Sequence, residues 1–77
     1  TLKPSELPLG LLPELDRRRA LHADKLRAYG AIEARDFPPE VEPTRQRRIH
    51  HLILKAGIRY EQGWIAWYDE AIGVLGE

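Results

Sequence analysis

The sequence contains no cysteine, which excludes disulfide-stapled scaffolds, thiolate metal sites and cysteine nucleophiles. It has no excess of charge, because twelve basic residues balance twelve acidic ones, whereas nucleic-acid coats and polybasic membrane binders need an excess of one sign. No apolar run approaches the about 20 residues that span a bilayer. Because the first residues also lack the features of a signal peptide, we expect a cytoplasmic protein.

Catalytic constellations are absent as well. Ser5 is the only serine, no glycine-rich phosphate loop is present, and most carboxylates are flanked by arginines, as on solvated helix faces. The adjacent His50 and His51 diverge by about 100° on a helix, so they cannot chelate one metal ion, and no third ligand lies at a suitable spacing. We therefore expect no enzyme, no metal site and no cofactor, and a surface or interface role for the histidines.

The composition is typical of a globular protein, with 43% hydrophobic and 31% charged residues. Prolines divide the sequence into pieces. Residues 1–12 are expected to be a leader or linker. A stretch rich in helix formers runs from about Pro13 to Arg35, and a second one without proline runs from Thr44 to Glu77. The sequence therefore predicts an all-α fold, a helical hairpin of two long helices. The prolines that forbid regular structure between them are Pro38, Pro39 and Pro43.

The first predicted helix has one apolar stripe. Leu12, Leu15, Leu26 and Tyr29 fall on it at helical spacing. Three polar residues share the stripe, so part of it is expected to be wet or paired. These are Arg19, His22 and Glu33.

The second predicted helix is apolar on two faces, about 140° apart at 100° per residue. Helix one can cover one of these faces, and nothing else in 77 residues is left to cover the other. This deficit indicates self-association or a missing domain. The first stripe consists of Ile49, Leu52, Ile53, Ala56, Tyr60, Trp64, Trp67, Ala71 and Val74, and the second of Leu54, Ile58, Ile65 and Ile72.

We expect the second stripe to remain open and to form the interface of a homodimer, because monomers rarely expose a contiguous apolar patch. Dimerisation would then complete the hairpin. The residues predicted for this dimer interface are Leu54, Ile58, Ile65, Ile72, Trp64 and Trp67.

Tyr60, Trp64 and Trp67 lie one turn apart on the first stripe, and three interpretations remain open for them. They can pack in the core, form the centre of an interface, or line a pocket for a flat aromatic ligand. Gly57 and Gly63 lie inside the same helix, where glycine often permits a close approach or leaves room beside a large ring.

Two arginine clusters, residues 17–19 and Arg45 with Arg47 and Arg48, raise the question of DNA phosphate contacts. Nearby acids dilute both clusters, and Glu40 and Glu42 are the expected partners of the second one. No groove-reading motif accompanies them. We therefore expect that this chain alone does not bind DNA specifically.

The segment from His51 to Ile72 resembles the last helix of PadR-like transcriptional regulators, in their virulence-activator-like C-terminal domain. Residues 19–29 resemble the arginine- and leucine-rich first helix of the same domain. The points of similarity in the last helix are Leu52 and Leu54, Gly57 with Ile58, Tyr60 with Glu61, and Trp67 followed by acidic and apolar residues.

This resemblance implies that residues 13–77 are the C-terminal dimerisation and effector domain of a bacterial regulator. The DNA-binding winged helix of such regulators is absent from this chain. The implied partners are a second copy of the chain, DNA through a winged-helix domain only, and a small aromatic effector, with no membrane. A free-standing helical module that binds another protein through its uncovered face is the alternative.

Overall fold

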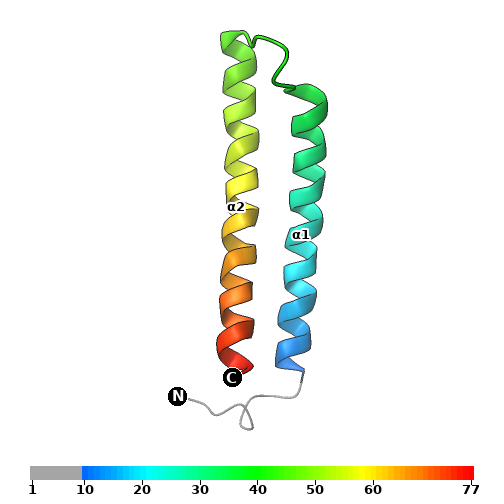
Figure 1. The fold of residues 1–77 in the computed structure, drawn as a ribbon, viewed down its shortest axis with the longest axis vertical. Helices are drawn as coiled ribbons and strands as arrows, with labels where there is room; N and C mark the ends of the chain where they lie inside the picture. Colours follow the sequence, from blue (N-terminus) through cyan, green and yellow to red (C-terminus); the bar gives the residue numbers. More distant parts are fainter. Residues whose placement is uncertain (1–9) are drawn as a thin grey trace.

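The computed structural model describes residues 10–77 and consists of two long helices that lie side by side and antiparallel (Figure 1). Helix α1 spans Leu11–Asp36 and helix α2 spans Arg45–Leu75, so residues 37–44 join them. The rod measures 55 × 19 × 15 Å. The predicted all-α helical hairpin is confirmed, while its completion by a second chain stays a prediction.

Helix α1 begins at Leu11, two residues before the predicted start at Pro13. Gly10 precedes it in the left-handed region at φ 87°, a conformation that favours glycine, and its carbonyl accepts the N–H of Glu14 at 2.9 Å. Pro13 is tolerated inside the first turn because an N–H there has no partner within the helix. The predicted leader, residues 1–12, falls mainly outside the described residues.

The loop ends α1 and starts α2 with defined hydrogen bonds. The Phe37 N–H donates to the Glu33 carbonyl at 2.9 Å, and the prolines that follow end the helix. Thr44 is the N-cap of α2, and its hydroxyl oxygen accepts the N–H of Arg47 at 3.2 Å. The start of α2 is therefore within one residue of its predicted position.

Replacing Thr44 with alanine is expected to lower the free energy of unfolding by about 1 kcal/mol, because the Arg47 N–H loses its side-chain acceptor. Thr44→Ser keeps a hydroxyl oxygen and should retain most of the stability. Thermal unfolding followed by circular dichroism, with all proteins at one concentration, measures both changes. Equal destabilisation by serine and alanine would show that the cap does not depend on the hydroxyl.

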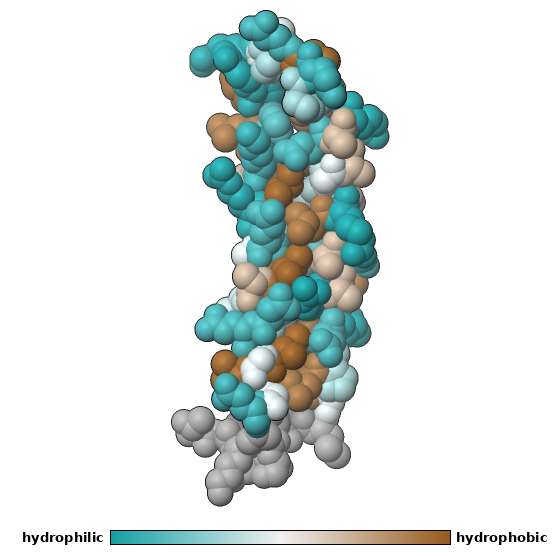
Figure 2. All heavy atoms as spheres, viewed as in Figure 1, coloured by the Kyte–Doolittle hydropathy of each residue, from teal (hydrophilic) through white to brown (hydrophobic). Residues whose placement is uncertain are grey.

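The two helices meet along a line that we call the seam. Half-buried or buried positions recur on each helix at alternating spacings of three and four residues, the pattern of a coiled coil. Figure 2 shows apolar residues running along the line between the helices, with hydrophilic residues on both sides. The seam consists of Leu12, Leu15, Arg19, His22, Leu26, Tyr29, Glu33 and Asp36 on α1, and His51, Leu54, Ile58, Glu61, Ile65, Tyr68, Ile72 and Leu75 on α2.

The predicted stripe of α1 is confirmed, including its polar members. Its leucines and tyrosine are half-buried in the seam, and each polar member has a partner on α2. The pairs are Arg19 with Asp69, His22 with Glu61, and Glu33 with His51.

Gly57 allows the helices to approach at one level of the seam. A Cβ atom placed on it would lie 3.3 Å from Cε2 of Tyr29, closer than ordinary van der Waals contact. The predicted role of a helix glycine beside a large ring is therefore found at Gly57, and the ring comes from the other helix.

Candidate functional site

The largest exposed apolar surface in the described chain lies on α2, on the side turned away from the seam. Among its members the exposed fraction is 68% at Ile53, 54% at Tyr60 and 52% at Trp67. We call this surface the outer face. It consists of Ile49, Leu52, Ile53, Ala56, Tyr60, Gly63, Trp64, Trp67 and Val74.

The structure reverses the expected roles of the two stripes. α1 covers the second stripe, which was expected to remain open, and leaves the first stripe exposed. The expectation that the second stripe remains open is wrong. Polar residues of α2 lie in line with this stripe, and α1 covers it because α1 supplies their partners. Four of the residues predicted for the dimer interface, Leu54, Ile58, Ile65 and Ile72, are half-buried in the seam, whereas Trp64 and Trp67 lie on the outer face.

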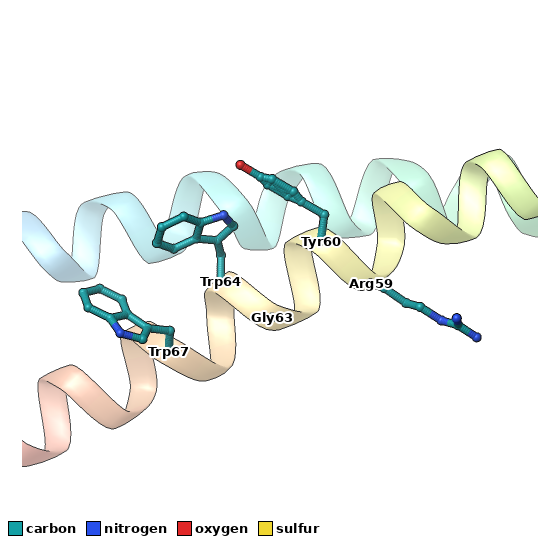
Figure 3. A pocket seen from close by; sticks show the side chains of 5 residues that line it. All are labelled: Arg59, Tyr60, Gly63, Trp64 and Trp67. Carbon is teal, nitrogen blue, oxygen red and sulfur yellow. The ribbon is translucent and has the colours of Figure 1, made fainter.

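The three rings singled out for a ligand do lie together. Tyr60 and Trp64 have ring centroids 6.3 Å apart, and Trp64 and Trp67 are 5.9 Å apart with nearly perpendicular planes. They line a hollow that also includes Arg59 and Gly63. Figure 3 shows the rings projecting from one side of α2, with Arg59 extending away from them. The hollow is open on its outer side, so a single chain would cover only part of a ligand.

Trp64 connects the outer face to a polar pair of the seam, in which Glu61 is buried and His22 is half-buried. Its ring stacks on His22 of α1, with centroids 5.7 Å apart and an angle of 13° between the planes. His22 Nδ1 in turn hydrogen-bonds the carboxylate of Glu61, a residue that is only 6% exposed. Tyr68 lies against the same histidine at 5.6 Å. The stacking on His22 of α1 therefore holds the Trp64 ring in place.

Sequence reasoning placed His22 on the stripe of α1 but missed Glu61 as its partner. A signal was present, since Glu61 follows Ile58 by three residues and precedes Ile65 by four, so it shares their stripe. A carboxylate at such a position needs a partner in the facing helix.

Two further polar contacts fix the ends of the seam. Near the open end, Arg19 Nε lies 2.5 Å from a carboxylate oxygen of Asp69 and holds the pKa of Asp69 below its ordinary value by hydrogen bonding. The stability from this pair is present above the pKa that Asp69 has in the unfolded chain, and it is lost as the pH falls through the lower folded value. Near the loop, His51 bonds Glu33 at 2.7 Å and stacks on Phe37.

Four arginines of the two clusters make contacts within the chain, namely Arg17, Arg18, Arg19 and Arg47. Glu14 binds both Arg17 and Arg18, whose hydrogen bonds lower its pKa to about 2. Arg47 donates to the Asp36 carbonyl and lies 5.4 Å from the centre of the Phe37 ring. In residues 10–77, Arg47 therefore has partners other than the acids expected for it, Glu40 and Glu42.

Within the described part of the chain, no three histidine or carboxylate side chains are grouped closely enough to hold a metal ion. In the same residues, neither helix has the length and apolar character required to cross a membrane. The fold and the outer face together define an all-α helical hairpin with an exposed apolar surface on α2.

Comparison with known proteins gives the family. The model of the C-terminal domain of virulence activator alpha matches residues 7–76, so the chain belongs to that family. This is a family of regulator-associated helical domains and not a class of enzymes. Neither a curated protein nor a solved structure matches the chain.

Proposed function

We propose that this chain is the dimerisation and effector domain of a PadR-like transcriptional regulator, and that two copies associate through the outer face of α2. The observation that supports the proposal is the exposure of large apolar side chains along this helix, such as Leu52 at 64% and Val74 at 56%. Such a contiguous surface is typical of an interface.

The energetics favour association. In residues 10–77 only Tyr68 and Glu61 are buried, so a single hairpin has a small core. Each large apolar side chain that a second copy covers contributes about 1.5–3 kcal/mol when it is fully removed from water. Aromatic residues such as Tyr60, Trp64 and Trp67 are common at the centres of interfaces.

In this proposal DNA is contacted by a winged-helix domain and not by the hairpin. The chain has no net charge, and several of its arginines already have partners within it. A dimeric regulator must hold two reading heads at a fixed half-site spacing, and a rigid pair of hairpins can set that distance.

Analytical ultracentrifugation at micromolar concentration tests this association. We expect twice the chain mass of 8.9 kDa, and a melting temperature that rises with protein concentration because pairing stabilises the folded hairpin. A cooperatively folded monomer at the same concentration would contradict the proposal. It would favour a free-standing module that binds a different protein through the same face.

An effector role predicts that planar phenolic compounds quench the tryptophan fluorescence of this domain, because both tryptophans line the hollow. Titrations of the chain should then show saturable quenching at 1:1 or 1:2 stoichiometry. The double variant Trp64→Ala/Trp67→Ala has no tryptophan, so isothermal calorimetry is the readout for it, and binding should be lost. Binding that survives both changes would locate the effector elsewhere.

A further inference from the structure

Charge is distributed unevenly along α2. From Thr44 to Tyr60 the sequence contains basic residues and no acidic one, and from Glu61 to Glu77 it contains acidic residues and no basic one. The helix accordingly has no acidic residue in its first turn and no basic residue in its last turn. This order opposes the helix dipole, which favours acidic side chains near the N-terminus and basic ones near the C-terminus. The stability of α2 therefore does not explain why its first half is basic.

Contacts within the hairpin satisfy only one member of this basic half. Arg47 donates to the Asp36 carbonyl. The acidic side chains at this end of α1 have other partners, since the Glu33 carboxylate bonds His51 and the Asp36 carboxylate is paired with its neighbouring arginine. Within residues 10–77, the remaining basic side chains of this half are exposed and form no ion pair. These are Arg45, Arg48, Lys55 and Arg59.

These four side chains lie along one side of α2, and we call them the basic row. At 100° per residue they fall within an arc of about 80°, between the seam and the outer face. Counted from Arg45, they follow at 3, 10 and 14 residues, so the row is about 21 Å long. Leu52, at the edge of the outer face, lies in the middle of the row and is 64% exposed. The row is therefore a line of cations around one apolar side chain.

Helix α1 leaves room beside the basic row. Tyr29 lies against Gly57 and Glu33 bonds His51, so this part of α1 is level with the middle of the row. In an antiparallel pair of right-handed helices, the positions that directly follow seam residues lie on the same side of the pair. On α1 these positions are the exposed Gly30 and Ala34, and on α2 they include Lys55. A Cβ atom placed on Gly30 would meet nothing within 4 Å. The surface beside the row is therefore low and open.

We infer that this side of the hairpin binds an acidic α-helix of another protein, about four turns long. A second helix has the same rise per residue as α2, so carboxylates at the spacings of the basic row would lie opposite its cations. Gly30 and Ala34 allow the backbone of that helix to approach, and Leu52 gives it an apolar contact. The inference does not depend on the proposed association of two copies.

The charges of the chain favour a short acidic helix over a nucleic acid. The chain has no net charge, and the second half of α2 is acidic, so a long polyanion would extend from the basic row over a surface that repels it. Phosphate groups also gain nothing from the exposed Leu52 in the middle of the row. A segment of about 21 Å ends before the acidic half begins.

Fluorescence anisotropy of a labelled peptide tests the inference on the full chain. The probe is an alanine-based helical peptide of about 15 residues, with glutamate at the four spacings of the basic row and leucine in the middle. The control peptide has glutamine in place of each glutamate. At about 50 mM salt the glutamate peptide should bind at least about tenfold more tightly than the glutamine peptide, and at about 500 mM salt this difference should disappear because the charges are screened.

Two double variants locate the binding surface. Arg48→Gln/Lys55→Gln should reduce the preference for the glutamate peptide to within about twofold. The matched control, Arg17→Gln/Lys25→Gln, removes two positive charges from α1 and should keep the preference. All four positions are exposed, so both variants should keep the helical circular dichroism signal of the native chain.

Three outcomes would overturn the inference. The native chain could bind both peptides equally, or both double variants could lose the preference equally, which would show that only net charge matters. A short DNA duplex of random sequence could bind more tightly than the glutamate peptide and be weakened by Arg48→Gln/Lys55→Gln, which would make the basic row a nucleic-acid contact. Ultracentrifugation measures the association of two copies separately, so none of these outcomes decides it.

Discussion

Introducing glutamate at Ile65 is expected to unfold the chain, whereas glutamate at Ile53 is expected to leave the hairpin folded and abolish pairing. Ile65 is half-buried in the seam, one turn from the buried Glu61, so a second carboxylate there is desolvated beside the first. An unpaired charge in such a place costs several kcal/mol, which a two-helix domain cannot absorb. Ile53 is 68% exposed, so a charge there remains hydrated in a single chain.

Circular dichroism and analytical ultracentrifugation together distinguish the two outcomes. Ile65→Glu should lose its helical signal, while Ile53→Glu should keep its helical signal and sediment as a species of 8.9 kDa. Ile53→Ala is the matched control that shortens the side chain without adding charge. If Ile53→Glu stayed a dimer, the outer face would not be the interface.

The second large effect is expected at the pair of His22 with the buried Glu61 in the seam. Replacing His22 with leucine removes the partner of a carboxylate that is only 6% exposed, and should lower the free energy of unfolding by about 3 kcal/mol. The double variant His22→Leu/Glu61→Leu replaces both groups with apolar ones. It should be within about 1 kcal/mol of the native chain or more stable, because no charge is left buried.

Urea unfolding at one fixed protein concentration measures the free energy of unfolding of the native chain, the single variant and the double variant. Asp24→Ala, which removes an exposed ion pair with Arg27, is the surface control and should leave the transition unchanged. If the single and double variants at His22 and Glu61 lost equal stability, the loss would reflect packing of the histidine ring and not the unpaired carboxylate.

The sequence predicted the two helices well because proline and helix formers act locally. Pro38, Pro39 and Pro43 separate two stretches that have few other choices of structure, and Thr44 is a strong N-cap. The start of α1 was less accurate, because Pro13 is compatible with several positions in the first turn and the left-handed Gly10 decides among them.

The prediction of which apolar face of α2 meets α1 was wrong. Both faces have helical spacing, and a single helix contains no information on which one a neighbour covers. The choice depends on contacts between residues far apart in the chain, such as His22 with Glu61 and the ring of Tyr29 against Gly57. The grouping of Tyr60 with the two tryptophans was predictable, since it depends on spacing within one helix.

The proline-rich connection between the helices has a consequence for how chains can associate. Two helical hairpins can exchange helices by opening into long continuous rods, a domain swap that preserves every contact of the seam. Here that route would place Pro39 and Pro43 in the interior of an uninterrupted helix. Each proline ring would clash there with the preceding turn, and each missing N–H would remove a backbone hydrogen bond. Swapping by this route is therefore disfavoured, and the proposed association is expected to join closed hairpins.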